Sequence, residues 1–329
     1  MLFQNAKHPV EMKVTHLNKV KAQRKQQLQL QMVNDKGLTS LISRAFTDLT
    51  KKDNTKKTSK FGLFKNKTAN KNCFVLDFHG DIKATEVQQL REEISTLLTV
   101  AQAEDEVIVR LESSGGMVHA YGLAAAQLAR IKEAGLNLTV CIDKVAASGG
   151  YMMACVADKI LAAPFAVVGS IGVVAQVPNF HDLLEKHDID VEVFTAGKYK
   201  RTVTVFGENT EEDKQKFQQE LEETHKLFKD FVRKYRPSLD VEQVATGEHW
   251  YGEDAITRNL VDALQTSDSY ILEKMTNSEL YAIQSRQKPT IAQKLGISQA
   301  AQAVVATAID KLPDALAKLE SAKMPMVKK

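Results

Sequence analysis

Two short loops of this chain, residues 112–116 and 147–150, place serine next to paired glycine. The first reads Glu-Ser-Ser-Gly-Gly and the second Ala-Ser-Gly-Gly, and each follows an apolar, strand-like run. Paired glycines let the backbone approach a ligand closely, and N–H groups at a helix start can hold an anion. Neither loop has the GxxxxGKS/T or GxGxxG spacing of a phosphate-binding loop. The chemistry that fits both loops is an oxyanion site beside a serine nucleophile.

Each loop also has a purely structural interpretation. A serine just before a helix is usually an N-cap, and two glycines between a strand and a helix usually make a tight turn. Two loops of one design after successive parallel strands lie near each other, because such loops share one edge of the sheet. That proximity favours Ser148 as a nucleophile, and its hydroxyl then needs a general base.

The histidines do not supply a clear base. None of the eight has a neighbourhood typical of a catalytic triad, although His119 falls in the first turn of a predicted helix and approaches the site. His249 stands beside Trp250, where packing or capping is the simpler interpretation. The GxSxG motif of α/β-hydrolases is absent, because position 146 is alanine.

Lysine is the other base to consider. Lys198, Lys200 and Arg201 place three cations within four residues, just after a strand predicted at 191–196. Burial and mutual repulsion lower the pKa of a lysine and leave neutral amine at working pH. A solvated basic turn is the alternative interpretation of the same residues.

Alternating strands and helices must position these loops. Strands are predicted at residues 73–80, 106–111, 137–143, 159–163 and 191–196, at intervals of about 30 residues with helices between most of them. This order indicates an α/β fold with a mostly parallel sheet covered by helices. A long charged helix is predicted at 210–235, and an Ala-rich amphipathic stretch follows at 297–318.

The composition, 43% apolar and 26% charged, is that of a globular protein. Residues 1–70 carry 15 Lys/Arg against 4 Asp/Glu, so +11, and the net charge of +3 leaves −8 for the rest. Such a basic arm is either a solvated segment or a contact to an anionic surface such as a membrane. The small net charge gives no support for nucleic-acid binding. No apolar run reaches 18 residues, and the N-terminus lacks a signal peptide's apolar stretch.

Cys73, Cys141 and Cys155 do not have CxxC or other metal-ligand spacing. We therefore expect no structural disulfide and no metal site. The reaction considered for Ser148 requires neither a metal nor a cofactor.

Three segments together resemble the signal peptide peptidase A family of serine proteases, and its SohB branch most closely. They are Glu112-Ser113-Ser114-Gly115-Gly116, Ala147-Ser148-Gly149-Gly150-Tyr151 and Ala196-Gly197-Lys198-Tyr199-Lys200. Further similar motifs lie at residues 78–83, 168–173 and 247–252, so the resemblance covers roughly residues 10–275.

The resemblance implies a Clp/crotonase-like α/β fold and a Ser/Lys dyad. By position, Ser148 matches the nucleophile and Lys200 the general base, 52 residues later. The family base lies three residues after the glycine, here Gly197, so Lys198 does not match. The backbone N–H groups of Gly116 and Gly149 match the oxyanion hole.

Ser170 matches a serine that helps to orient the lysine in the family. The chain departs from the family at Ser114, where proline is usual; proline restricts φ, so we expect a less rigid loop here.

The resemblance also predicts an organisation and a setting. Residues 1–72 are predicted to be a basic arm and linker lacking the family's membrane helix, 73–275 the Ser/Lys protease domain, and 276–329 a C-terminal helical extension. The implied protein is a homo-oligomer at the inner membrane, with a periplasmic catalytic domain. It would act on membrane-derived or periplasmic peptides.

Two other functions remain open. A non-proteolytic crotonase-like protein would bind acyl-CoA with the same loops, give Lys200 no role and need a nucleotide-binding surface. An inactive scaffold would keep the protease residues without activity. Labelling of Ser148 by a fluorophosphonate separates both from a protease.

Overall fold

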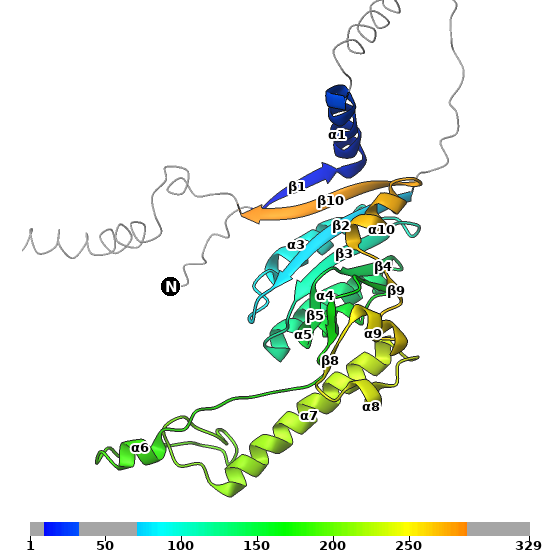
Figure 1. The fold of residues 1–329 in the computed structure, drawn as a ribbon. Coiled ribbons are helices and arrows are strands. Elements are labelled where there is room, and N and C mark those ends of the chain that lie inside the picture. The colour runs from blue at the N-terminus through cyan, green and yellow to red at the C-terminus, as the bar shows by residue number, and fades with distance from the viewer. Residues whose placement is uncertain (1–9, 33–70, 288–329) are drawn as a thin grey trace, which may run out of the picture. The chain divides into compact units, whose positions relative to one another are not determined.

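The structure, a computed structural model, describes residues 10–32 and 71–287 (Figure 1). Residues 12–285 form one compact unit, which contains the candidate site. Of a second unit made from both ends of the chain, only residues 10, 11, 286 and 287 are described, at the ends of two strands.

The unit is built on a mostly parallel sheet with the strand order β1-β10-β2-β3-β4-β6-β9. A branch continues from β3 through β5 to β7, and β8 joins β7 as an antiparallel strand. The predicted α/β fold with a mostly parallel sheet is thus confirmed. The strands are β1 (Val10–His16), β2 (Lys71–Gly80), β3 (Glu106–Ser113), β4 (Asn137–Ile142), β5 (Val145–Ala147), β6 (Lys159–Ala162), β7 (Val167–Gly169), β8 (His249–Tyr251), β9 (Ala263–Leu264) and β10 (Ser278–Gln287).

Apolar runs form the central strands because both faces of the sheet are buried there. On β2, Phe74, Leu76 and Phe78 belong to the large core cluster on one face, whereas Cys73 and Val75 belong to a smaller cluster on the other. This alternation follows from the two-residue period of a strand.

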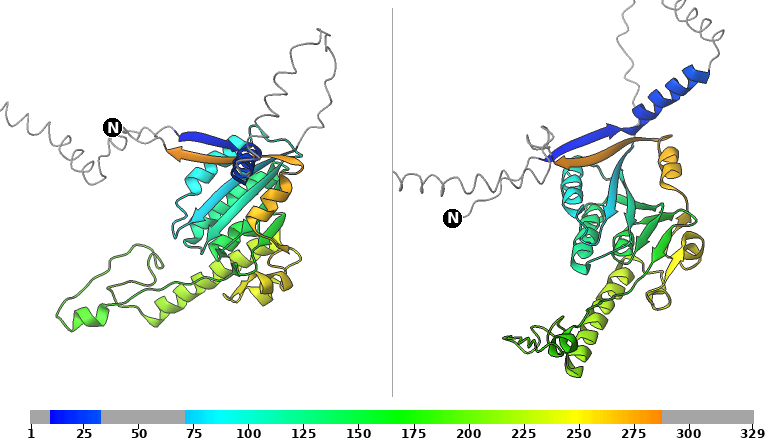
Figure 2. Two further views of the ribbon diagram at one scale, coloured as in Figure 1. Left: turned by 45° about the horizontal axis from the view of Figure 1, so that its top comes forward. Right: turned by 60° about the vertical axis from the view of Figure 1, so that its left-hand side comes forward.

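Helices cover the two faces unequally (Figure 2). Helices α3 (Val87–Leu97), α4 (Val118–Glu133) and α5 (Gly149–Ala154) pack on the face of the large cluster. Helix α10 (Ser267–Lys274) contributes Tyr270 and Ile271 to the smaller one. The remaining helices are α1 (Leu17–Met32), α6 (His181–Glu185), α7 (Glu211–Tyr235), α8 (Val241–Val244) and α9 (Gly252–Thr257).

Helix α7 confirms the predicted long charged helix. Thr210 and Asp213 form a capping box at its start, so the first backbone N–H groups of the helix are satisfied. Only Phe228 and Val232 are buried on it, and both lie in its C-terminal half.

The strand predicted at 191–196 is wrong. These residues have no regular secondary structure, and all but the first are exposed. Their apolar–polar alternation resembles a strand, but none of the strands that the structure describes pairs with them, and a strand needs such a partner for its backbone hydrogen bonds. Lys200 therefore does not follow the carboxyl end of a strand, contrary to the prediction.

The sheet continues beyond both predicted limits of the protease domain. Strand β10 pairs in parallel with β2, with Leu280 opposite Cys73, although a helical extension was expected from residue 276. Part of the predicted basic arm forms strand β1, and Asn18, at the start of α1, accepts from Leu280 N–H at 2.9 Å. The Ala-rich stretch at 297–318 and most of the predicted linker lie outside the described residues.

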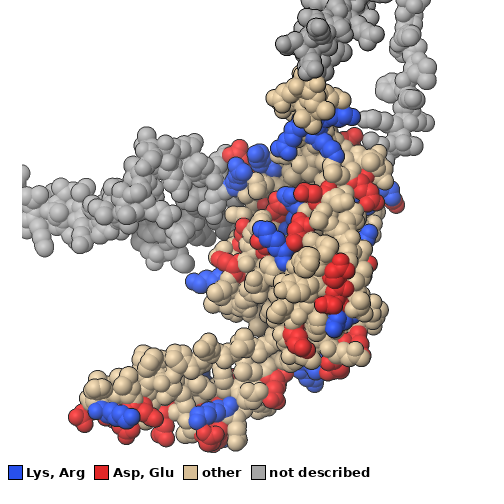
Figure 3. Space-filling view, viewed as in Figure 1, with Lys and Arg blue, Asp and Glu red and all other residues tan. Residues whose placement is uncertain are grey.

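No helix within residues 10–32 and 71–287 has the length and apolar character needed to cross a membrane. On the face drawn in Figure 3, basic and acidic side chains are interspersed. The described part of that face therefore has no large field of one sign.

Candidate active site

Ser148 lies between β5 and α5 with φ +51° and ψ −118°, a backbone conformation that residues other than glycine rarely adopt. Its N–H donates to the carbonyl of Gly169 at 2.8 Å, and its carbonyl accepts from the N–H of Met152 at 3.0 Å. The half-buried side chain makes no capping hydrogen bond to the helix. The structural interpretation of Ser148 as an N-cap is therefore not supported.

Ser148 opens into a cavity of about 820 Å³ at the carboxyl ends of β3 and β5. The loop after β3 forms one wall with Ser114, Gly115 and Gly116. Apolar side chains give the cavity a mainly hydrophobic lining; they are Ile82, Met117, Val118, Val173 and Val174. A serine in a concave, largely apolar pocket is typical of a binding or catalytic site.

The two glycine loops touch each other beside Ser148. Gly115 has φ +89°, and a Cβ there would lie 2.8 Å from the carbonyl oxygen of Ala147 and from the nitrogen of Gly149. Within the described residues, the N–H groups of Gly116 and Gly149 have no hydrogen-bond partner. Both groups are therefore able to donate to a bound oxyanion, and the oxyanion role that the family resemblance implies for them stays a prediction.

The loop carrying Ser114 is held in place without a proline. Gly115 N–H donates to the hydroxyl of Ser113 at 3.0 Å, and Met117 N–H donates to the carbonyl of Ile82 at 2.9 Å. Hydrogen bonds at both ends thus restrain the loop, and Ser114 itself is exposed and lines the cavity.

Ser170 lies in the same cavity as Ser148, just after β7. Its φ is +52°, and its N–H donates to the carbonyl of Glu248 at 2.6 Å. The structure therefore brings Ser148, Ser170 and the Gly116 and Gly149 loops together.

Lys200 is not brought to this group. It is exposed in the irregular segment before α7, and no described hydrogen bond joins its amine to Ser148 or Ser170. Its role as the general base stays a prediction. Lys198 forms an ion pair with Glu212 at 3.0 Å, and the hydrogen bonds that its ammonium donates to Tyr199 and Glu212 raise the pKa of Lys198. A lysine with a raised pKa stays protonated at neutral pH and so has no free amine to act as a general base.

His225 is a cavity residue that the sequence analysis did not single out. It is half-buried on α7, and its Nε2 donates to the carbonyl of Ile171 at 3.2 Å. His225 precedes Phe228 by three residues and Val232 by seven, so helical spacing places it on the buried face of α7. This helical spacing is the sequence feature that could have identified His225 as a residue on the buried face of α7.

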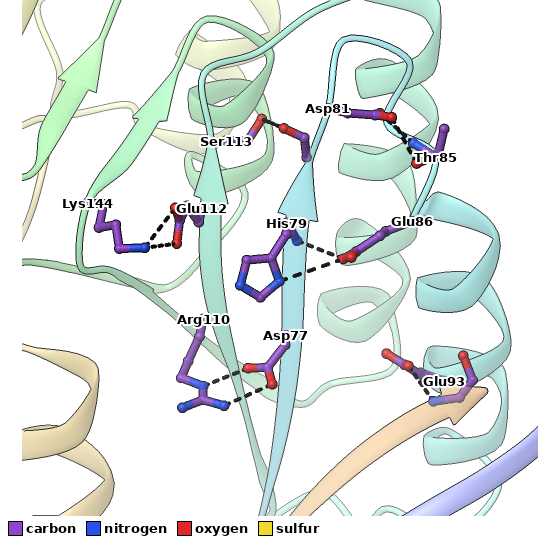
Figure 4. Close-up of polar contacts among 12 residues, drawn as sticks. Asp77, His79, Asp81, Thr85, Glu86, Glu93, Arg110, Glu112, Ser113 and Lys144 are labelled. Carbon is purple, nitrogen blue, oxygen red and sulfur yellow. Dashed lines mark hydrogen bonds and ion pairs between the residues drawn. The ribbon is translucent and has the colours of Figure 1, made fainter.

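A cluster of charged side chains lies on the sheet face that also carries the smaller core cluster, and Figure 4 shows its contacts. Arg110 donates to Asp77 through Nε at 2.6 Å and Nη2 at 2.8 Å, and Lys144 donates to both carboxylate oxygens of Glu112. Glu112 therefore points away from the serine loop that it precedes. The charges in these contacts are paired between neighbouring segments, which indicates a structural role.

The described residues contain one group with metal-ligand geometry, His181, Asp182 and Glu185 on the short helix α6. Asp182 accepts from the His181 ring at 3.1 Å and raises the pKa of His181. These residues do not line the Ser148 cavity, and exposed groups of this kind occur without a metal.

Comparisons with known proteins match the part of the chain that contains the candidate site. The family description "Peptidase family S49 N-terminal" matches residues 2–128, and "Peptidase family S49" matches residues 130–281. The probable protease SohB of Haemophilus influenzae is 65% identical over 223 residues, which cover 68% of this chain and 63% of that protein. The probable protease SohB of Buchnera aphidicola from Acyrthosiphon pisum is 58% identical, over 66% of this chain and 65% of that protein.

A solved structure of a mutant 1510-N membrane-bound stomatin-specific protease has a TM-score of 0.43 and 13% identity, covering 65% of this chain and 98% of that chain. This likeness is too distant to assign residues. The chain spans less than two thirds of the length of the two SohB relatives.

A mostly parallel α/β sheet with a strained serine beside backbone N–H groups that have no partner among the described residues is typical of proteins equipped for acyl-transfer chemistry. The chain belongs to peptidase family S49, and its similarity to SohB proteins confirms the family that the glycine loops predicted.

Proposed function

We propose that this protein is a serine endopeptidase that hydrolyses peptide bonds with Ser148 as nucleophile and Lys200 as general base. The observation that carries the proposal is the strained, uncapped Ser148 in a cavity beside the N–H groups of Gly116 and Gly149. An ordinary helix cap has no need for a strained backbone or for two donors left without partners.

In the proposed reaction, the neutral amine of Lys200 takes the proton of the Ser148 hydroxyl as Oγ attacks the scissile carbonyl carbon. The carbonyl oxygen becomes an oxyanion that accepts from Gly116 and Gly149 N–H. When the C–N bond breaks, the leaving amine takes the proton from Lys200 and an acyl-enzyme ester remains. Lys200 then takes a proton from water as the water oxygen attacks the ester carbonyl, and it gives this proton to Ser148 Oγ when the ester C–O bond breaks and the acid product leaves. Ser170 shares the cavity and helps to orient the amine.

The exposed position of Lys200 leads to a proposal about assembly. The segment around it exposes large apolar side chains; they include Val174 at 90%, Phe194 at 87% and Phe206 at 51%. Large apolar side chains exposed to this extent in one segment are typical of an interaction site. We propose that a second copy of the chain covers this segment, and that association brings Lys200 to a Ser148.

The dyad is tested by fluorophosphonate labelling and casein cleavage. We expect the wild type to label at Ser148 and cleave, and Ser148→Ala and Lys200→Ala to lose cleavage by at least about a thousandfold. Lys198→Ala is the matched control and should keep activity. Normal cleavage by Lys200→Ala would sink the dyad, and acyl-CoA binding without labelling would favour the non-proteolytic alternative.

Mixing the two inactive variants tests where the dyad forms. If Lys200 of one copy serves Ser148 of a neighbour, co-refolded Ser148→Ala and Lys200→Ala recover about a quarter of wild-type activity, because one random pairing in four is complete. No recovery places both residues of a working dyad in one copy.

We propose peptides and proteins as substrates, bound as extended segments with small or apolar side chains. The apolar lining formed by Ile82, Met117 and Val173 supports this choice. By resemblance, the substrates are membrane-derived or periplasmic peptides. Cleavage of a peptide library should therefore fall when charged side chains occupy the positions next to the scissile bond.

We also propose, from the family resemblance, that the protein is associated with the inner membrane and has a periplasmic catalytic domain. The +11 charge of residues 1–70 supports contact with anionic headgroups. The full chain should co-sediment with vesicles containing phosphatidylglycerol, less with purely zwitterionic vesicles, and less again at about 0.5 M salt. Equal binding to both vesicle types would contradict the proposed electrostatic contact with anionic headgroups.

A further inference from the structure

A buried hydrogen-bond chain lies behind the loop that carries Gly116. Ser113 and Tyr121 are 2% and 0% exposed, and their hydroxyl oxygens are 2.5 Å apart. The Tyr121 hydroxyl donates to the carbonyl of Asp81 at 2.7 Å. The N–H of Gly115 donates to the Ser113 hydroxyl at 3.0 Å. The chain thus joins the loop after β2 to the loop after β3.

Each hydroxyl proton in this hydrogen-bond chain points to a single acceptor. A carbonyl only accepts, so the proton of Tyr121 points to Asp81. The Ser113 proton must then point to the Tyr121 oxygen, since its other acceptor, the carbonyl of Gly80, is 3.4 Å away. Burial raises the pKa of Tyr121, so the phenol keeps its proton at neutral pH. The Ser113 oxygen remains free to accept from Gly115.

The same two residues also touch the loop that carries Ser148. A Cβ on Gly149 would lie 2.4 Å from Cγ of the Tyr121 ring, and a Cβ on Gly150 would lie 2.5 Å from the carbonyl oxygen of Ser113. Tyr121 and Ser113 therefore contact the segments of both oxyanion donors. The contact of Tyr121 is made by its ring and that of Ser113 mainly by its backbone carbonyl, so the hydrogen bonds that fix the ring and the backbone at these two residues also fix the separation between the segments.

We propose that Tyr121 and Ser113 are positioning residues, which set the separation and orientation of the N–H groups of Gly116 and Gly149. The inference rests on the proposed peptidase function. An oxyanion hole works when its donors lie 2.7–3.1 Å from the developing oxyanion, and loss of one donor lowers kcat by about 10²–10³. A donor that is displaced but not lost should lower kcat by a smaller factor than this.

The test compares Tyr121→Phe and Ser113→Ala with Tyr151→Phe in the full chain. Tyr151 is the matched control, because it is also fully buried and its hydroxyl donates to a backbone carbonyl, that of Leu260, at 3.0 Å. We expect kcat to fall about 10- to 100-fold in Tyr121→Phe and Ser113→Ala, with KM within about twofold. Tyr151→Phe should keep kcat within about twofold. The double variant should be little worse than the poorer single, because the two hydroxyls act as one chain.

Two further readouts separate positioning from a general loss of structure. The affinity of a peptide aldehyde, whose adduct with serine needs the oxyanion hole, should fall in parallel with kcat, while that of a product peptide stays constant. Amide exchange at residues 113–117 should speed up in both variants, and this holds even if the chain has no peptidase activity.

Unchanged kcat in folded Tyr121→Phe, or an equal fall in Tyr151→Phe, would overturn the inference. If Tyr121→Phe does not fold, Ser113→Ala carries the same prediction, and unchanged kcat there overturns it. A wild type that neither labels nor cleaves refutes the proposed function instead, whereas a fully active wild type with equally active variants refutes this inference alone.

Discussion

At the scale of single residues, the site depends on backbone strain at Ser148. A residue other than glycine with φ +51° is held there by its surroundings, here by the hydrogen bond from Ser148 N–H to Gly169 and by the start of α5. Such strain costs on the order of 1–3 kcal/mol and concentrates at functional positions. It also makes a prediction about stability that is independent of catalysis.

Ser148→Gly should unfold at higher denaturant concentration than Ser148→Ala, by about 1 kcal/mol in unfolding free energy. Glycine adopts this conformation without strain, whereas alanine keeps the strain and loses only the hydroxyl. Neither variant should label with a fluorophosphonate. Equal or reversed stabilities, measured by urea unfolding, would show that the backbone at residue 148 is not strained.

Gly116→Ala should reduce kcat about a hundredfold, because a Cβ would lie 2.2 Å from the carbonyl oxygen of Ile82 and must displace the donor. Gly122→Ala is the matched control, since a Cβ there meets nothing within 4 Å on helix α4. The control should gain up to about 1 kcal/mol of stability from helix propensity and keep full activity. A hundredfold loss in both variants would argue against a specific role of Gly116.

At the scale of elements, α3 and β10 are joined by a buried carboxyl group. Glu93 on α3 is 4% exposed and accepts from the N–H of Ser285 on β10 at 2.7 Å. Burial raises the pKa of Glu93, and the nearby carboxylates Asp77 and Glu86 raise it further, while the bonds from Ser285 partly oppose the shift.

A raised pKa means that the folded state binds this proton more tightly than the unfolded state does. The contribution of Glu93 to stability is therefore full below the ordinary carboxyl value of 4.5 and is lost as the pH rises towards the folded-state pKa. In Glu93→Gln, which keeps an acceptor for Ser285, this part of the pH dependence should vanish. Urea unfolding of both proteins between pH 4 and 8 measures it, and parallel curves would contradict the assignment.

At the scale of the whole molecule, the exposed apolar segment before α7 predicts assembly. Phe194→Asp should leave the unfolding free energy nearly unchanged, since the side chain is 87% exposed in the single chain. It should lower the molar mass measured by light scattering and reduce fluorophosphonate labelling of Ser148. Val100→Asp, at a position 63% exposed after α3, is the control and should keep the wild-type mass. A monomeric wild type would end the proposal.

Much of this molecule follows from sequence patterns alone. The apolar runs of β2, β3 and β4 predict buried parallel strands, and the two glycine loops predict Ser148, Gly116 and Gly149 near one another, because loops after neighbouring parallel strands share an edge. The alternating segment at 191–196 misled because local alternation does not reveal whether a partner strand exists.

Only the tertiary structure decided the rest. Contacts between residues far apart in the chain decide the strain at Ser148 and the position of His225 in the cavity. The same holds for the hydrogen bonds that link Tyr121 with Asp81 and Ser113. Sequence periodicity reports which face of an element is buried, but not which atoms meet there. The sequence by itself therefore determined which residues we propose as nucleophile and oxyanion donors, and the fold decided the contacts that hold them in place.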